Sequence, residues 1–432
     1  MRRLLPLLPL ALTGAFLAPV PAASAAPEPM TGPAAAPTAL AAPAAPTGKA
    51  AARKIAYEQW DTPAELRSGR LVKTRVTRGT VVQTKAAQGR RKVDGTTYDV
   101  GHWLSPWTKP GFALTELIGS WSATTTGDSW IEVSVRGRAA GGGQSSWDVL
   151  GRWTSGDEHT LRTSVGVQGD DLADVNVDTW KASRGIASYQ LRVSLARRAG
   201  TKAKATLDTV GAVASRLPAG PVATSKPGVA RGITLDVPRY SQMIHQGHSP
   251  QWGNGGEAWC SPTSTSMVLG YYGALPAAAD RAWVGSGHPD PWVDHAARMT
   301  YDAAYRGTGN WPFNTAYAAP LAGHAFVTRL RSLREAERLV KAGIPVVVSV
   351  SFGRGQLSGA PISATNGHLL VIVGFTQAGD VVVNDPAAPT NAGVRRTYDR
   401  GQLENAWLPR SGGLAYVIRD DAHPLPASNG TW

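Results

Sequence analysis

Alternating hydrophobic and polar residues predict strands through the first half of the chain. Residues 130–136 alternate Ile and Val with Glu, Ser and Arg, and residues 189–195 repeat this period of two. Further strands are expected over residues 71–83, 161–167 and 205–213, between turns rich in Gly, Asp and Ser. Short strands at this spacing, each with one buried face, predict an all-β sandwich domain over residues 55–217.

The second half of the chain mixes helical and strand patterns. Residues 333–340 carry apolar side chains at helical spacing, and they follow a capping-box pattern made by Ser332 and Glu335. Residues 346–352 and 369–375 are continuous apolar runs, which are typical of buried strands. These patterns predict an α+β domain over residues 232–432.

Two segments without periodic apolar patterns separate these parts. Residues 26–54 are dominated by Ala and Pro, and residues 218–231 are rich in Pro and Gly, so we expect both to be linkers. The linker at 218–231 predicts that residues 55–217 and 228–432 fold separately.

The start of the chain has the pattern of a signal peptide over residues 1–25. Arg2 and Arg3 precede an apolar stretch over residues 4–17, and Ala23-Ser24-Ala25 offers a cleavage site. The stretch contains prolines and is shorter than the ~20 residues that span a bilayer. We therefore expect a secreted, extracellular protein without a stable membrane anchor.

Composition narrows the function. The 432 residues contain one Cys, which excludes an internal disulfide and a four-Cys metal site. The 44 Lys and Arg exceed the 31 Asp and Glu, but the excess is spread along the chain, so nucleic acid is not an expected partner. Eight Trp in the predicted sandwich leave two interpretations open, since they could stack on a carbohydrate or cell-wall polymer or fill the core.

The single cysteine, Cys260, is the strongest candidate for chemistry. Pro262 lies where a helix can begin and Gly273 where it can end, so Cys260 is expected at a helix N-terminus. There the helix dipole favours the thiolate. An unpaired thiol in an exported protein is exposed to oxidation, which argues for a use.

A thiolate nucleophile needs an imidazole and a group that orients it. His368 precedes the apolar run 369–375, and Asp385 follows a second apolar run after a turn-rich segment. The two runs predict a hairpin that brings Asp385 back to His368, with a register uncertain by one or two residues. Asp385 would then fix the tautomer and orientation of the imidazole.

These motifs resemble the C39-like peptidases, a branch of the papain-like cysteine peptidases. The resemblance covers about residues 232–420 and is carried by Trp259-Cys260-Ser261-Pro262, Gly367-His368 and Asn384-Asp385-Pro386. It implies a papain-like α+β fold, a Cys-His-Asp triad and a peptide or protein substrate. Residues 236–242 resemble the family's first strand, whose Gln helps to form the oxyanion hole, which implies that role for Gln242.

Two departures from the family pattern matter. Ser261 follows the nucleophile where the family usually has Gly, and the insert over residues 243–258 is long, so Gln246 and Gln251 remain alternatives to Gln242. The insert also contains His245 and His248, which have the spacing of two metal ligands. Because the sequence places no third ligand nearby, we predict no metal and no cofactor.

We therefore expect a secreted thiol hydrolase that cleaves peptide or related amide bonds through a thioester. The alternative is a noncatalytic cell-wall or glycan-binding protein with a degenerate peptidase-like domain. Reactivity of Cys260 towards iodoacetamide or E-64 distinguishes the two.

Overall fold

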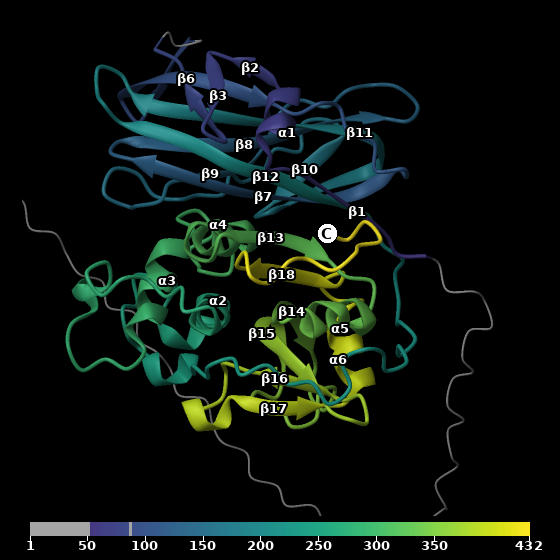
Figure 1. Ribbon diagram of the computed structural model, residues 1–432. Helices are drawn as coiled ribbons and strands as arrows, with labels where there is room; N and C mark the ends of the chain where they lie inside the picture. Colours follow the sequence, from purple (N-terminus) through teal and green to yellow (C-terminus); the bar gives the residue numbers. More distant parts are fainter. Residues whose placement is uncertain (1–51, 86–88) are drawn as a thin grey trace, which may run out of the picture. The chain divides into compact units, whose positions relative to one another are not determined.

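The computed structural model describes residues 52–85 and 89–432 (Figure 1). The predicted signal peptide and most of the first predicted linker lie outside the described residues. The first region of the structure is β-rich and holds one short helix among twelve strands. Its elements are β1 (Lys54–Trp60), α1 (Pro63–Ser68), β2 (Arg70–Val72), β3 (Thr74–Thr77), β4 (Thr80–Gln83), β5 (Gly89–Val93), β6 (Thr96–Leu104), β7 (Leu114–Thr126), β8 (Ser129–Ala139), β9 (Asp148–Trp153), β10 (Ala173–Asn176), β11 (Thr179–Arg198) and β12 (Lys204–Arg216).

The strands form one hydrogen-bonded 12-stranded sheet, where the sequence predicted two separate sheets. Strand β11 is 20 residues long and connects the sheet. Its first residues pair with β7, and after register shifts its remaining length pairs with β8 and β6. The β character of this region is confirmed. Because β11 changes partners along its length, the twelve strands form one hydrogen-bonded network, and their arrangement as a two-layer sandwich stays a prediction.

Some of the predicted strands are present in the structure and others are not. Residues 130–136, 189–195 and 205–213 lie within β8, β11 and β12. The stretch 71–83 is divided into three strands, because Lys73 and Arg78 adopt positive φ angles of 54° and 49°. The prediction of a strand over residues 161–167 is wrong.

Residue Arg162 explains why that stretch does not become a strand. The side chain is fully buried and its guanidinium donates to the backbone carbonyls of Thr154, Gly156 and Arg298. Only one isolated bridge, between Thr163 and Arg152, links the stretch to a strand. The burial of this stretch is the reverse of what the alternation predicts, since Arg162 and Ser164 are buried while Leu161 and Val167 are exposed.

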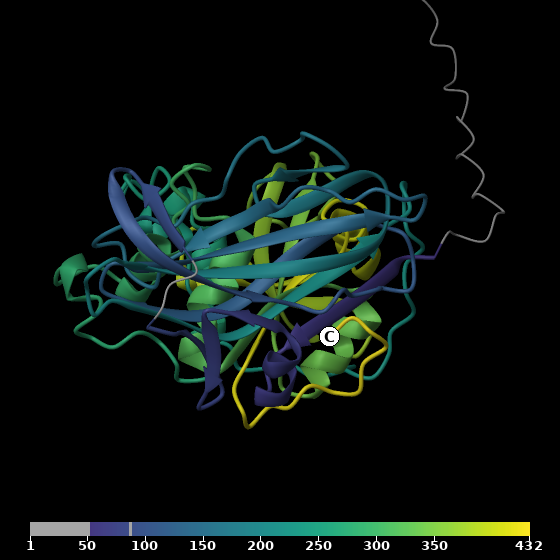
Figure 2. The same ribbon diagram turned by 90° about the horizontal axis from the view of Figure 1, so that it is seen from above.

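The second region is a six-stranded antiparallel sheet in the order β13-β18-β14-β15-β16-β17, with helices on both faces (Figures 1 and 2). Its elements are η1 (Gln242–His245), η2 (Gly256–Ala258), α2 (Cys260–Tyr271), η3 (Ala282–Val284), α3 (Pro291–Thr300), α4 (Trp311–Ala322), β13 (His324–Arg329), α5 (Leu333–Lys341), β14 (Val346–Phe352), β15 (Thr365–Phe375), β16 (Val381–Asn384), η4 (Asn391–Gly393), β17 (Arg395–Tyr398), α6 (Arg400–Trp407) and β18 (Leu414–Arg419).

Alternate residues of the central strands enter two different cores. In β15, Leu369 and Val371 pack with residues of α2, α3 and α4, while Leu370 and Ile372 pack with residues of α5 and α6. Because both faces are covered, the strand reads as an unbroken apolar run rather than as an alternation. The predicted buried strands and helix are confirmed at β14, β15 and α5.

Two local predictions in this region need correction. Ser332 is the N-cap residue of α5 but its side chain makes no capping bond, and Glu335 instead accepts from Arg331 N at 2.7 Å. The Leu333 N–H of this helix is capped by Glu404 of α6. Residues 235–241 form no strand, and Gln242 begins the short helix η1.

The two regions share a core that the sequence did not reveal. Phe313 of α4 is fully buried against Trp121 and Trp153 of the β-rich region, with ring centroids 6.2 and 5.7 Å apart. Arg329 of β13 is also buried and donates to Glu116 of β7 at 2.6 Å. One hydrophobic cluster runs through both regions. Their separate folding stays a prediction, which this interface makes testable.

No helix among residues 52–85 and 89–432 has both the length and the apolar character needed to cross a membrane.

Candidate active site

Cys260 is the first residue of helix α2, as the sequence predicted. Trp259 before it is fully buried and donates from Nε1 to the Trp252 carbonyl, which fixes the chain just ahead of the helix. Residues 261–269 are buried on all sides, so α2 is a central helix rather than one with a single apolar face. Cys260 itself is half-buried and carries a free thiol at the end of this rigid element.

The β15–β16 hairpin brings His368 and Asp385 together. Its register pairs Val371 with Asn384, and one bulge lies between Ile372 and Gly374. Asp385 therefore lies diagonally across from His368, two residues away from the directly opposite position, at a distance side chains can span. His368 Nε2 and Asp385 Oδ1 are 2.7 Å apart. The pairing is present with a register slip of two residues.

The buried His368 ring links the carboxylate to the thiol. Since Nε2 faces Asp385, the other ring nitrogen is left to form the side-chain hydrogen bond with Cys260. Burial lowers the pKa of His368, but the charge and hydrogen bond of Asp385, together with Cys260, outweigh this effect and raise it. The imidazole is therefore held as an imidazolium.

The thiol responds in the opposite direction. Burial raises the pKa of Cys260, but the hydrogen bond and charge of His368 and the backbone N–H groups of Leu369 and Ser261 outweigh burial and lower it. Both shifts favour the same charged pair, a thiolate beside an imidazolium. Such a pair is the reactive form of a cysteine nucleophile.

Tyr398 of β17 is a site residue that the sequence did not suggest. Its hydroxyl donates to Asp385 Oδ2 at 2.6 Å, while Ala387 N donates to Asp385 Oδ1 at 3.0 Å. Burial raises the pKa of Asp385, but the charge and hydrogen bond of His368, and then the bond from Tyr398, lower it overall. With both oxygens bonded, the carboxylate stays ionised and keeps one orientation.

Gln242, at the start of η1, lines the same cavity as Cys260. It is 4% exposed, and its Nε2 donates to the Glu257 carbonyl at 2.6 Å. Because that carbonyl can only accept, it fixes which end of the amide is the N–H donor, and the second N–H is free to face a substrate. Gln246 and Gln251 are exposed, and of the three glutamines only Gln242 lines the cavity around Cys260.

The cavity around Cys260 has a volume of about 850 Å³ and is lined by both regions of the chain. The β10–β11 turn, residues 176–179, forms one wall with Lys181. Asp178 in this turn is buried and accepts from Trp311 N at 3.1 Å, which ties the turn to α4. Burial raises the pKa of Asp178 to about 6. The β-rich region therefore contributes directly to the cleft.

Ser261 replaces the usual Gly without disturbing the site. Its side chain is fully buried, and its hydroxyl lies 2.9 Å from the Tyr416 hydroxyl of β18. The side chain thus points into the contact between α2 and the sheet, away from the position of a substrate.

The eight Trp of the β-rich region pack in its interior or under arginines. Six of them are buried, and Trp107 and Trp147 are half-buried. The Arg136 guanidinium lies 5.1 and 4.5 Å from these two ring centroids, and Arg138 and Arg192 cover them further. Cation–π stacking of this kind occupies the ring faces that a sugar would need.

An antiparallel sheet covered by helices, with a Cys at the start of a buried helix beside a His–Asp pair on the sheet, is the arrangement of papain-like cysteine peptidases. Comparison with protein families supports that class. Residues 234–414 match the Peptidase_C39 like family, and residues 56–215 match the Peptidase C39 N-terminal domain. The chain thus carries a domain of the C39-like peptidase family, as the resemblance indicated. No curated protein matches the chain.

Proposed function

We propose that this chain is an exported cysteine peptidase that cleaves peptide bonds through a triad of Cys260, His368 and Asp385. The observation that carries the proposal is the continuous chain of contacts from the Cys260 thiol through His368 to Asp385, at the floor of a cleft. A degenerate scaffold would not require these three side chains to remain in contact at a cleft.

The proposed reaction proceeds in two steps. The Cys260 thiolate attacks the scissile carbonyl carbon, and the tetrahedral intermediate collapses to a thioester as the His368 imidazolium donates its proton to the leaving amine. The neutral imidazole then takes a proton from water, which attacks the thioester and releases the acid product and the thiolate. The second Gln242 N–H and the Cys260 backbone N–H, at a helix N-terminus, would stabilise the oxyanion.

The β-rich region would take part in substrate binding. Residues 176–179 and Lys181 face the same cavity as Cys260, so a bound peptide must pass along them. We propose that this region forms a wall of the substrate cleft. Binding of a cell-wall polymer to another surface of the region is a separate hypothesis, which is tested by measuring whether the protein sediments with insoluble polysaccharide.

The experiment is digestion of a peptide library and of peptidoglycan by the purified protein, with new termini identified by mass spectrometry. We expect cleavage by the parent and nearly none by Cys260→Ser or His368→Ala, because no other group attacks the carbonyl or protonates the amine. Cleavage that survives Cys260→Ser would overturn the thiol mechanism. Absence of cleavage together with an unreactive Cys260 would favour the noncatalytic alternative.

A further inference from the structure

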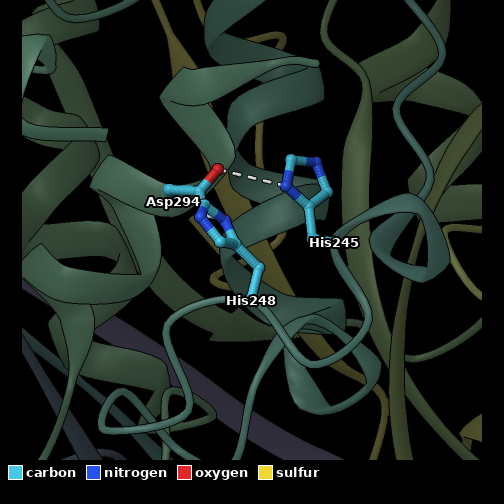
Figure 3. Close-up of side chains that lie close together, drawn as sticks. All are labelled: His245, His248 and Asp294. Carbon is cyan, nitrogen blue, oxygen red and sulfur yellow. Dashed lines mark ion pairs between the residues drawn. The ribbon is translucent and has the colours of Figure 1, made fainter. Parts of the chain in front are cut away.

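Two histidines of the insert that precedes Cys260 meet a carboxylate from helix α3, and together they are three potential metal ligands. His245 ends η1, His248 follows it by three residues, and Asp294 projects from α3 (Figure 3). One ligand atom from each of the three side chains lies within 4.8 Å of the other two. The sequence supplied the two histidines and predicted no metal because it offered no third ligand nearby. The fold supplies that ligand from a helix 46 residues further along the chain.

The cluster is deeply buried. His245 and Asp294 have side chains only 1% and 0% exposed, and His248 is 22% exposed. Nδ1 of His245 lies 3.1 Å from Asp294 Oδ2, and Nδ1 of His248 is close to the other carboxylate oxygen. A buried carboxylate without compensation is costly, so these atoms require either hydrogen bonds or a cation.

Hydrogen bonds do not account for the contacts. Among the residues that the structure describes, neither oxygen of Asp294 and neither of the two Nδ1 atoms has a hydrogen-bond partner, although the distances are short. The ring N–H directions do not meet the carboxylate oxygens. By contrast, His324 and Asp421 form an ordinary hydrogen-bonded pair at 2.8 Å elsewhere in the same domain. Each Nδ1 instead lies against a different oxygen of Asp294, so the three side chains form a compact buried group without hydrogen bonds between them.

We propose that His245, His248 and Asp294 bind a divalent transition-metal ion, with Zn²⁺ the best match. Two imidazoles and one carboxylate are a common zinc ligand set, and three protein ligands leave a fourth position for water. Ligand atoms around a tetrahedral Zn²⁺ at ~2.0–2.2 Å lie about 3.3–3.6 Å from one another. The spacing at His245 is slightly shorter than this, and Nδ1 of His248 would have to move away from Asp294 when the ion binds. Mg²⁺ and Ca²⁺ prefer sites made of oxygen atoms.

The ion would fasten the long insert to the body of the domain. His245 is the last residue of η1, the helix that Gln242 begins, and a Cβ at Gly256 would lie 2.3 Å from the His245 backbone. The segment ahead of Cys260 therefore packs directly on one of the ligands. Binding of His245, His248 and Asp294 to one ion would therefore fix to α3 residues 243–258, a segment whose regular structure is limited to the short helices η1 and η2.

The test is Zn²⁺ binding to the full chain carrying Cys260→Ser. This substitution removes the thiol of the active site, which could otherwise bind Zn²⁺ as well. After treatment with a chelator, the protein is titrated with ZnCl₂ in a calorimeter, and bound metal is counted by elemental analysis. We expect one Zn²⁺ per chain, a higher melting temperature with metal present, and slower hydrogen exchange over residues 243–258. Co²⁺ in place of Zn²⁺ should give the intense visible absorption of a four-coordinate site.

Variants decide which residues bind. His248→Ala should weaken the affinity by at least about 100-fold, since it removes one of three ligands, and its partial exposure favours a folded protein. Asp294→Asn should do the same if it folds, whereas His324→Ala, which removes the ordinary His–Asp pair, should leave the affinity unchanged. The proposal is overturned if the parent binds no Zn²⁺, or if it binds Zn²⁺ no more tightly than His248→Ala does.

Discussion

Replacing Asp385 with Asn isolates the effect of its charge on His368. The Asn oxygen can still accept from His368 and Ala387, and its amide N–H can donate to the Tyr398 hydroxyl oxygen. The geometry is therefore retained while the negative charge 2.7 Å from the imidazole is lost. We expect the pKa of His368 to fall, because Asp385 is the principal group that raises it.

The magnitude follows from the charge and its distance. An opposite charge at this range moves a titration by about 1–3 pH units, and each unit is worth about 1.4 kcal/mol. Because the pKa of His368 is raised in the folded protein, the imidazolium is present below that raised value and is lost as pH rises through it. In Asp385→Asn this loss should occur about 1–3 pH units lower.

Two inactivators separate the roles of thiolate and imidazolium. Iodoacetamide needs only the thiolate, whereas the epoxide of E-64 also needs a proton donor as its ring opens. In Asp385→Asn, the alkaline limb of E-64 inactivation should therefore move to lower pH, while alkylation by iodoacetamide at high pH is retained. Asp385→Ala should be more severe, since it also leaves Tyr398 and Ala387 N without their acceptor. An unchanged alkaline limb in Asp385→Asn would refute the electrostatic role of Asp385.

Three further substitutions test other parts of the structure. Gln242→Ala should lower kcat by about 10²–10³ with little change in KM, the usual loss for one oxyanion donor, while Gln251→Ala should be silent; the reverse result would move the oxyanion role to Gln251. Tyr398→Phe should lower the free energy of unfolding in urea by about 1.5–3 kcal/mol, because the buried Asp385 loses a charge-assisted hydrogen bond, and an unchanged midpoint would count against that bond. Phe313→Ala should cost about 3–5 kcal/mol in one cooperative transition, with Phe313→Leu costing less; two separate transitions would show that the β-rich and peptidase regions unfold independently.

The sequence predicted the features that depend on local patterns. The apolar run 369–375 identified a strand buried on both faces, and the residues around Cys260 predicted a helix start correctly. The prediction of the hairpin was also correct. Its exact register could not be predicted, because the bulge between Ile372 and Gly374 shifts the pairing and has no signature in the local sequence. The sandwich prediction did not include a strand such as β11, which changes partners along its length and links all twelve strands by hydrogen bonds.

Contacts between elements far apart in the sequence could not be predicted from local patterns. Tyr398 reaches Asp385 only because β17 lies beside β16, and a Tyr in a strand is ordinarily a packing residue. Asp294 reaches His245 only because α3 packs beside the insert. Phe313 similarly joins α4 to two tryptophans of the β-rich region, although composition had predicted a boundary between the regions. In each case the residue type was visible in the sequence but its partner was not.

The central claim is that the fold activates Cys260, and the rate of its alkylation by iodoacetamide at pH 6 tests this most directly. Cys260 is the only thiol in the chain, so every label reports on this residue. We predict faster alkylation in the folded protein than in urea, because the site lowers the pKa of the thiol, and loss of that advantage in His368→Ala. A half-buried thiol without activation would instead be protected by folding. Slower labelling of the folded protein than of the unfolded chain would contradict the account.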